Sequence, residues 1–509
     1  MGFLEERDLT NLPTIPEFFR GKSIFITGGS GFMGKVLVEK LLYSCTDLDK
    51  IYLLLRSKKG ISPVDRLQKM YSLPCFDRLR KDRPGAFESK VAVVAGDVSK
   101  VGLGLSAEDR ELIIKNVNII FHVAASIRFD DPLPVSANIN IRSTVEVMEI
   151  AKEMKNLNVL VHVSTAYANS AWNPIEEKIY PAYADWRETL NVCDNVDETT
   201  MNILAPKYIG DVPNTYIFTK QLAEHAVYEQ KGKLPIVIVR PSIVISSVKE
   251  PVTGWIENFN GPAGIFTGAG KGILRCLYSS KDFSGDFVPV DGCIRHFIAA
   301  AWIRGTKKLI PSDDIEIYNC CSMEKVTNSY IMNVGKKLAV DIPLDSALWT
   351  VNCKFTTSRL IYYINVLIRH IIPALLVDTI LWISGKKPML MKLQRKIFIN
   401  NIAVQKFLIL EWEFALNNFY KLRSCLKEED MQEFYYDFKN FFCIEYYKNI
   451  ILAAKKFLLK EKIENLPKAK EHMKRIILAD VIIRYLSYGA VAWAFISSKF
   501  VFNLYQKML

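Results

Sequence analysis

A glycine-rich turn near the N-terminus constrains the fold more than any other feature of the chain. Residues 23–27 (SIFIT) form an apolar run that predicts a buried strand, and residues 35–42 (KVLVEKLL) have helical periodicity. Between them, glycines recur at three-residue spacing at positions 28, 31 and 34. Glycine lets the backbone approach a pyrophosphate, and free N–H groups at the helix start bind it, so the turn predicts a dinucleotide site. The expected cofactor contacts here are Thr27, Gly28, Ser30, Gly31, Phe32, Met33 and Gly34.

Five further apolar runs extend this unit into a sheet. They lie at 50–56, 90–97, 119–125, 159–163 and 236–242. The runs are almost continuously apolar and alternate with helical segments, which is typical of parallel strands covered by helices on both faces. The sequence therefore predicts an α/β fold with a Rossmann-like doubly wound parallel sheet.

The end of the second run indicates which cofactor is bound. The residue at this position normally meets the adenosine ribose, and an acidic residue there favours NAD. Here Arg56 is followed by Ser57, Lys58 and Lys59, a cluster that suits a 2′-phosphate. A solvated basic loop is the alternative. We therefore expect NADPH as the cofactor, with Arg56 and Lys58 among its contacts.

The fourth run ends in two small residues. Ala124 and Ala125 would let the cofactor backbone pass close to the chain, so both are expected cofactor contacts. His122 lies within the same apolar run, and we expect a hydrogen-bonded core histidine there in preference to a catalytic one.

Tyr216 and Lys220 form the candidate catalytic pair. They stand at i and i+4 of an amphipathic segment, so one helical turn places both on the same face. A nearby ammonium group favours the phenolate, and we expect it to lower the tyrosine pKa from its usual value of about 10. Tyrosine can then give a proton to an oxygen that receives hydride charge, while lysine holds the nicotinamide ribose.

Two hydroxyls at the end of the fifth run complete the constellation. Ser164 and Thr165 follow that strand directly, and adjacent strand residues face opposite ways. Only one of them should therefore polarise a carbonyl, and we favour Thr165. The long segment 169–213, before the tyrosine, is either a lid or acyl-pocket wall, or a surface insertion.

Several runs, in order along the chain, resemble one family, the alcohol-forming fatty acyl-CoA reductases of the extended short-chain dehydrogenase/reductase superfamily. They are TGGSGFMGKVLVEKLL, LLLRSKKG, FHVAASIRFDDPL, VHVSTAYANS, NTYIFTKQLAE and IVRPSIV. The resemblance covers most of residues 15–300, the expected NADP-binding reductase domain. Residues 350–465 resemble the helical second domain of the same family. One departure is Ser143, which stands where the superfamily usually has glycine.

The resemblance implies more than the residues alone, which support only an NADP-dependent carbonyl reductase. It implies reduction of a long-chain fatty acyl-CoA to a primary fatty alcohol, with release of CoA, in two hydride steps through an aldehyde. It also implies cofactor contacts from Asp97 and Val98 beside the adenine and from Pro241 and Ser242 after the sixth strand. An aldehyde-forming reductase, a sterol-type dehydrogenase and a non-catalytic NADP-binding scaffold are the alternatives.

The C-terminal third contains two apolar stretches. Residues 360–383 are interrupted by Arg369, His370, Pro373 and Asp378, so we expect a helical pair that lines an acyl tunnel or lies on a membrane.

The second stretch is residues 476–505. Its uncharged run, 485–498, is shorter than the roughly 20 residues that span a bilayer. Arg484 and Lys499 could extend it by snorkelling. A spanning anchor, a re-entrant hairpin and a docked helix remain open. We expect membrane association, with the catalytic domain facing the cytosol at the endoplasmic reticulum or peroxisome.

Composition excludes some other classes. The net charge is +12, but the chain has no motif that reads DNA or RNA, so we expect no nucleic-acid partner. The ten cysteines include no C-x-x-C pair, which argues against a zinc site, and we expect no metal. Residues 1–20 carry Glu5, Glu6 and Asp8 and lack the apolar core of a signal peptide.

Overall fold

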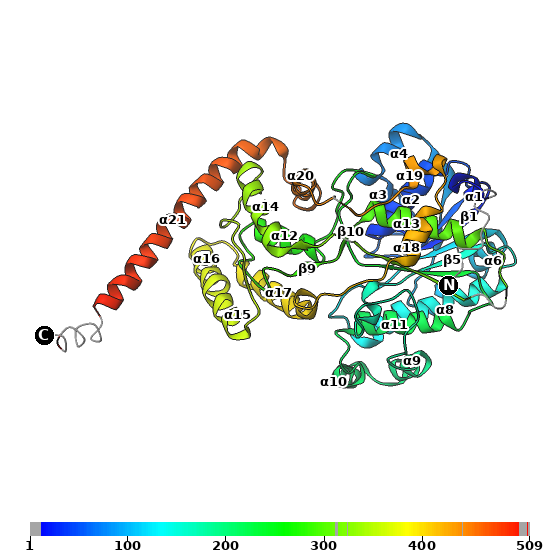
Figure 1. The fold of residues 1–509 in the computed structure, drawn as a ribbon, viewed down its shortest axis with the longest axis horizontal. Helices are drawn as coiled ribbons and strands as arrows, with labels where there is room; N and C mark the ends of the chain where they lie inside the picture. Colours follow the sequence, from blue (N-terminus) through cyan, green and yellow to red (C-terminus); the bar gives the residue numbers. More distant parts are fainter. Residues whose placement is uncertain (1–11, 311–313, 323, 440, 498–505, 507–509) are drawn as a thin grey trace. The chain divides into compact units, whose positions relative to one another are not determined.

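The chain divides into two compact units (Figure 1). The computed structural model describes residues 12–310, 314–322, 324–439, 441–497 and 506. The first unit contains Met1–Glu257, Ser284–Lys325 and Ala403–Tyr446. The second contains Asn258–Phe283, Val326–Ile402 and Tyr447–Leu509.

A seven-stranded parallel sheet forms the centre of the first unit. Its strand order is β11-β6-β5-β4-β1-β2-β3, and every neighbouring pair is parallel. The strands are β1 (Ser23–Thr27), β2 (Ile51–Leu55), β3 (Val91–Ala95), β4 (Val117–His122), β5 (Val159–Val163), β6 (Ile236–Pro241) and β11 (Glu316–Cys320). The predicted doubly wound fold is confirmed, and six strands match the six predicted runs. The seventh, β11, was not predicted, because its sequence EIYNC mixes polar and apolar residues.

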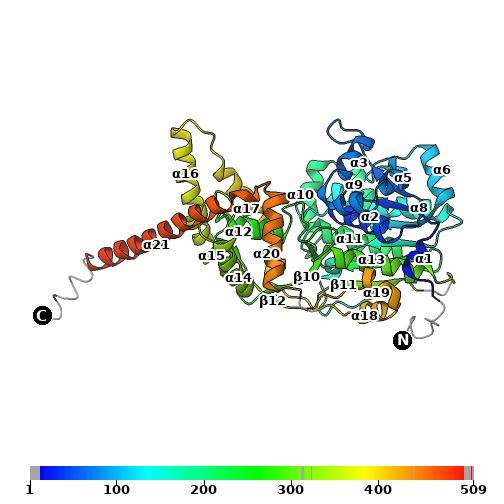
Figure 2. The ribbon, with the colours of Figure 1, turned by 90° about the horizontal axis from the view of Figure 1, so that it is seen from above.

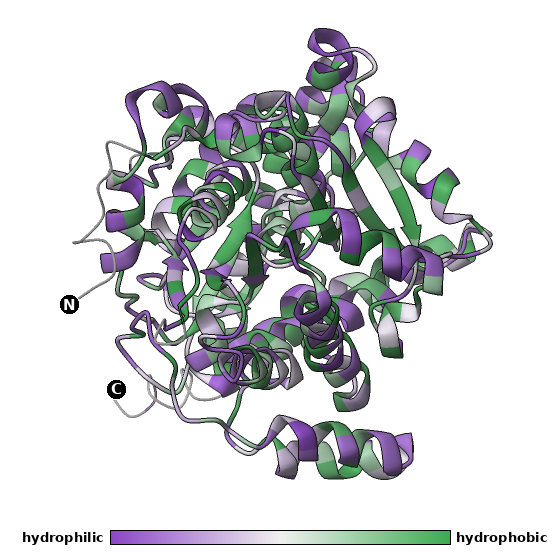
Figure 3. Ribbon diagram, turned by 90° about the vertical axis from the view of Figure 1, so that its right-hand side faces the viewer, coloured by the Kyte–Doolittle hydropathy of each residue, from purple (hydrophilic) through white to green (hydrophobic). Residues whose placement is uncertain are grey.

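Helices cover both faces of this sheet. α2 (Phe32–Ser44) packs against α13 (Val290–Gly305), which also contacts β5 and β6. α8 (Ser143–Glu153) and α11 (Thr215–Tyr228) pack together on the opposite face (Figure 1). Figure 3 shows the hydrophobic residues concentrated in the strands, with hydrophilic residues on the outer sides of the helices. Burial of the strands on both faces explains their continuous apolar sequence.

The other elements of the first unit are shorter. Its helices are α1 (Ile15–Phe19), α3 (Pro63–Tyr71), α4 (Asp77–Asp82), α5 (Ala86–Lys90), α6 (Ala107–Asn116), α7 (Leu133–Ala137), α9 (Trp186–Asn195), α10 (Glu198–Tyr208), α18 (Asn417–Ser424) and α19 (Met431–Phe434). Its short strands are β7 (Ile243–Ile245), β9 (Ser284–Gly285) and β10 (Phe287–Pro289). α9 and α10, in the long segment 169–213, contribute to a hydrophobic cluster with α7 and α11.

The second unit is mainly helical. Its helices are α12 (Pro262–Gly270), α14 (Asn328–Asp341), α15 (Arg359–Val366), α16 (Ile372–Ile383) and α21 (Leu466–Ile496), together with most of α17 (Leu390–Ala403) and α20 (Ile444–Ala453). A π-helical segment, Leu367–Ile371, joins α15 to α16. The short strands are β8 (Cys276–Tyr278), β12 (Val326–Thr327) and β13 (Lys354–Thr356), and β8 pairs with β13. Of the predicted membrane segment 476–505, residues 498–505 lie outside the described residues.

The compact units do not follow the ranges 15–300 and 350–465. Residues 403–446 belong to the first unit, where α18 packs on β11 and α13. Residues 258–283 belong to the second unit, where β8 pairs with β13. The chain passes between the units several times, and such crossings depend on long-range packing that contiguous sequence ranges do not reveal.

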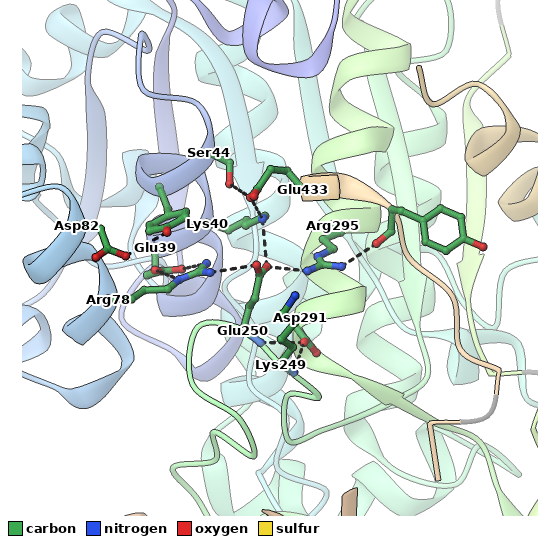
Figure 4. A network of polar contacts seen from close by, with 12 residues as sticks. Glu39, Lys40, Ser44, Arg78, Asp82, Lys249, Glu250, Asp291, Arg295 and Glu433 are labelled. Atoms are coloured by element: carbon green, nitrogen blue, oxygen red, sulfur yellow. Dashed lines mark hydrogen bonds and ion pairs between the residues drawn. The ribbon is translucent and has the colours of Figure 1, made fainter. Parts of the chain in front are cut away.

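A buried ionic network centres on Glu250 (Figure 4). Its carboxylate lies 3.0 Å from Lys40 Nζ, 3.0 Å from Arg78 Nη1 and 2.8 Å from Arg295 Nη2. Lys40 also lies 2.7 Å from Glu433. Burial disfavours the Glu250 carboxylate, but the charges of Lys40, Arg295 and Arg78 outweigh it and lower its pKa to about 2. The network therefore connects α2, the helix that begins at the glycine turn, to α4, α13 and α19.

We predict that Glu250→Gln destabilises the full chain by about 3–5 kcal/mol at neutral pH, because it leaves the buried Lys40 and the half-buried Arg78 and Arg295 without their shared anion. The pKa of Glu250 is lower in the folded state, so its contribution is present above about pH 5 and is lost as pH falls toward 2. Urea unfolding of wild type and variant at several pH values tests both statements.

Glu153→Gln is the matched control. Glu153 pairs with Arg110 at the surface, where the side chains are 52% and 35% exposed, so its loss should leave the stability nearly unchanged. Equal effects of the two substitutions would contradict a structural role for the Glu250 network.

Candidate active site

The glycine turn forms a cradle that leaves no room for side chains. Gly28 has φ +75°, and a Cβ atom there would lie 2.6 Å from the backbone nitrogen of Ala124. A Cβ atom on Gly34 would lie 2.3 Å from the carbonyl oxygen of Gly28. Gly31 caps α2 without a side-chain hydrogen bond, so the amide groups of the first turn remain available to an anion. Phe32 and Met33 begin that helix. The cradle therefore fits a pyrophosphate.

The polar core behind the turn joins β1 to β4, where the strand order changes direction. The Thr27 hydroxyl lies 2.7 Å from His122 Nδ1, and His122 Nε2 lies 3.1 Å from the Thr144 hydroxyl. Burial, followed by the charge of Lys220, lowers the pKa of His122 to about 3. The prediction that His122 is a hydrogen-bonded core residue is confirmed. Ala124 and Ala125 follow β4 at the same edge of the sheet.

The four predicted catalytic residues come together at the end of β5. Lys220, in α11, donates a 2.6 Å hydrogen bond to the carbonyl oxygen of Val163, the last residue of that strand. Thr165 forms a side-chain hydrogen bond with Tyr216. The neighbouring Ser164 hydroxyl is buried and has no hydrogen-bond partner among the described residues. This geometry is consistent with the preference for Thr165 as the hydroxyl that acts with Tyr216.

The pKa values of the pair correct one expectation. Burial raises the pKa of Tyr216 to about 12, and the hydrogen bond from Thr165 offsets this only in part. Burial lowers the pKa of Lys220 to about 8, against the opposing charge of Glu224. The predicted lowering of the tyrosine pKa is therefore wrong for the protein alone, because the ammonium group points to the Val163 carbonyl. Tyr216 is protonated near pH 7 and is able to donate a proton.

Two arginines lie beside the cradle. Arg56 follows β2 and forms a 3.2 Å ion pair with Asp97, which follows β3. Arg66, in α3, donates to the backbone oxygen of Arg56 at 2.6 Å and to the Ser30 hydroxyl at 3.1 Å. Burial and the charge of Arg56 lower the pKa of Arg66. An anion between these guanidinium groups would relieve their repulsion, so the donor set fits a phosphate group. Lys58 is exposed in the following turn.

Arg66, which lies ten residues beyond Arg56, was not predicted as a cofactor contact. The available signal was its position near the start of a helix that follows the basic turn.

The remaining expected contacts lie at other strand ends. Val98 follows Asp97 after β3. Pro241 ends β6, and the backbone N–H of Ser242 donates to the Cys320 carbonyl at 3.0 Å. β6 adjoins β5, whereas β1 lies further along the sheet. Pro241 and Ser242 are therefore positioned on the Tyr216 side of the edge, away from the glycine turn.

An aromatic cluster extends from Tyr216, formed with Phe129, Phe407, Tyr167 and Trp412. Ring centroids are 5.9 Å apart for Phe129 and Tyr216, and 5.4 Å apart for Phe129 and Phe407. Tyr167 lies 5.6 Å from Phe407 and 5.5 Å from Trp412. No local sequence pattern predicts this cluster, because its members are far apart in the chain. It forms an apolar wall beside Tyr216.

Two family descriptions match the chain. Both carry the description Male sterility protein, one an NAD-binding family over residues 26–297 and the other a family named Sterile over residues 369–461. The reductase (R) domain of a nonribosomal peptide synthetase from Mycobacterium tuberculosis has the same fold, with a TM-score of 0.54 and 14% identity over 87% of this chain and 94% of that one. The terminal R domain from the myxalamid PKS-NRPS biosynthetic pathway also has a TM-score of 0.54. It is 17% identical, and the match covers 86% of this chain and 91% of that one.

Curated relatives match over nearly the whole chain. Fatty acyl-CoA reductase 1 of Homo sapiens is 38% identical over 467 residues, covering 91% of this chain and 90% of that protein. Fatty acyl-CoA reductase wat of Drosophila melanogaster is 35% identical over 479 residues, covering 94% and 92%. Similarity of this extent, together with the Tyr216–Lys220 site on a dinucleotide-binding sheet, shows that the chain belongs to the fatty acyl-CoA reductase family.

Proposed function

We propose that this chain reduces a long-chain fatty acyl-CoA to a primary fatty alcohol with NADPH and releases CoA. The observation that carries the proposal is the hydrogen-bonded Thr165–Tyr216 pair at the strand end where Lys220 is anchored. It lies in a chain whose relatives are named fatty acyl-CoA reductases. The paired arginines Arg56 and Arg66 favour NADPH over NADH.

The chain's own residues explain both reduction steps. When bound, the nicotinamide supplies hydride to the carbonyl carbon. Tyr216 and Thr165 donate hydrogen bonds to the carbonyl oxygen and stabilise its negative charge as it forms. The resulting hemithioacetal collapses to an aldehyde and expels CoA thiolate. In the second step Tyr216 again faces the oxygen and gives it a proton, so two NADPH are consumed for each alcohol formed.

We also propose that the protein works on a membrane, with its catalytic unit facing the cytosol, at the endoplasmic reticulum or peroxisome. Two helices, Arg359–Ile383 and Ile463–Ile496, are long and apolar enough to cross a bilayer. The second overlaps the expected segment 476–505, and its apolar side chains are exposed, with Leu486 at 67% and Trp493 at 72%. An insoluble product is a further reason to place the enzyme there.

Tyr216→Phe tests the reaction. We expect it to lower turnover by roughly 10²–10⁴-fold, because the proton donor is lost, while NADPH binding remains. The measurement is NADPH oxidation by membranes containing the full chain, with palmitoyl-CoA as substrate and the lipid products identified. Wild type should consume two NADPH per CoA released and form fatty alcohol.

Two comparisons make this test specific. Thr165→Ala should reduce turnover more than Ser164→Ala, since Thr165 bonds to Tyr216. Consumption of one NADPH per CoA released, with free aldehyde as the product, would indicate an aldehyde-forming reductase. Full activity of Tyr216→Phe would reject the proposed catalytic role, and no turnover by wild type despite NADPH binding would favour the sterol-type or scaffold alternative.

Arg66→Ala tests the cofactor assignment. Loss of a hydrogen-bonded cation should weaken NADPH binding by about 1.5–3 kcal/mol, or roughly 10–100-fold, and change NADH binding far less. Tryptophan-quenching titrations with both cofactors measure the difference. Arg110→Ala, on α6 and paired with Glu153, is the control. An equal loss for NADPH and NADH would show that Arg66 does not recognise the 2′-phosphate.

Phe407→Ala tests the aromatic cluster as an acyl-pocket wall. We expect a rise of roughly tenfold in the KM for long-chain acyl-CoA, because the ring packs against Phe129, Tyr167 and Trp412. The KM for NADPH should not change. Phe414→Ala is the control. Phe414 contacts Tyr167, so in the order of ring contacts it lies beyond Tyr167 and further from Tyr216 than Phe407 does. Parallel changes in both KM values would indicate a general loss of structure.

A further inference from the structure

The helix formed by α15, the π-helical segment and α16 (Arg359–Ile383) has the reverse of the usual amphipathic arrangement. Its buried residues recur every four positions and include the polar side chains of His370 and Asp378. The buried residues are Tyr362, Val366, His370, Ala374 and Asp378. Its other sides, here called the outer face, expose large apolar side chains, including Leu367, Ile368, Leu375, Leu376, Ile380 and Trp382. Leu376 is 61% exposed and Trp382 is 70% exposed. A surface helix in water normally turns such residues inward.

The polar residues of this helix bind to the second unit itself. His370 Nε2 accepts a 2.9 Å hydrogen bond from the backbone N–H of Arg275. The Asp378 carboxylate accepts bonds from three backbone N–H groups, those of residues 389–391, at 2.8–3.0 Å. These contacts explain why ionisable side chains occur in so apolar a stretch. They also fix the direction in which the outer face points.

The same contacts argue against a helix that crosses a bilayer by itself. α15 packs on β8 and β13, and Tyr362 contacts the ring of Tyr278 at 5.6 Å. These two strands form an isolated pair of only three residues each, whose outer backbone groups cannot be left unsatisfied in hydrocarbon. The helix is therefore attached along one side to a part of the protein that must stay in water.

Charge beside the outer face identifies its partner. Residues 359–403 contain one acidic residue, Asp378, and seven basic ones: Arg359, Arg369, Lys386, Lys387, Lys392, Arg395 and Lys396. Lys386 and Lys387 are exposed in the turn between α16 and α17, close in sequence to Trp382. In Figure 2, α16 stands out from the other helices of its unit. Exposed apolar residues, a tryptophan and a basic cluster together match an anionic phospholipid surface.

We propose that the outer face of Arg359–Ile383 lies in the plane of an anionic bilayer surface, with Leu376 and Trp382 among the acyl chains and Lys386 and Lys387 among the headgroups. Charged side chains at the end of α16 oppose deep insertion of that end. This contact is separate from the C-terminal segment 476–505, and it does not depend on the proposed reaction.

The first test locates the outer face with a label in the full-length chain. Cys443→Ser removes the one exposed cysteine among the described residues, since the other nine are buried. Leu376→Cys then carries an environment-sensitive fluorophore, and Ile203→Cys, 74% exposed on α10, is the matched control. The protein is inserted into preformed vesicles of phosphatidylcholine and phosphatidylserine that contain brominated acyl chains. We expect strong quenching at position 376 and none at position 203.

The outcomes separate the possible occupants of the outer face. Quenching at position 376 that weakens with Lys386→Glu/Lys387→Glu supports the proposal. Quenching by aqueous iodide in place of brominated lipid would overturn it, since the face would then lie in water. Protection from both quenchers would also overturn it, because a second copy or another protein would cover the face.

A second test distinguishes an in-plane helix from a spanning one. Arg359→Cys and Lys386→Cys mark its two ends, and a membrane-impermeant maleimide is added outside the sealed vesicles. Reaction at both positions supports the in-plane arrangement. Reaction at only one end would mean that the helix crosses the bilayer, and it would overturn the proposal.

Discussion

Parallel pairing of the strands is the constraint on which the rest of the first unit depends. Parallel hydrogen bonding places the carboxyl ends of all seven strands at one edge of the sheet. The register aligns Thr27 with His122 and His122 with His162, so the glycine turn and the polar core meet there. The bond from Lys220 to Val163 then fixes α11, which carries Tyr216 and Lys220, to the same edge. The glycine cradle and the candidate catalytic residues share one edge because neighbouring strands run in the same direction.

Burial acts on the titratable groups of this unit in opposite ways, depending on their neighbours. Glu250 is buried among three cations, and its pKa falls to about 2. Tyr216 lacks such a partner, and its pKa rises to about 12. The first group therefore remains an anion that stabilises the fold, and the second remains a proton donor. The same desolvation thus leaves an anion at one place and a protonated phenol at another, because only Glu250 has cations beside it.

The C-terminal third contributes to both units in different ways. Residues 403–446 return to the first unit and bring Phe407 and Trp412 into the aromatic cluster beside Tyr216. The helix Arg359–Ile383 belongs to the second unit and turns its apolar residues outward. Residues 403–446 therefore contribute to the wall beside Tyr216, whereas the helix Arg359–Ile383 presents an exposed apolar surface.

The sequence by itself determined the features that depend on residues close to one another along the chain. Glycine spacing identified the cradle, apolar runs identified six of the seven strands, and the four-residue spacing of Tyr216 and Lys220 identified the helix that places both side chains at the end of β5. The tertiary structure decided the position of Arg66, the aromatic contacts of Phe407 and the direction of the Tyr216 pKa. The physical reason is that spacing along a strand or helix sets local geometry directly. Desolvation and contacts between distant segments depend on the path of the whole chain.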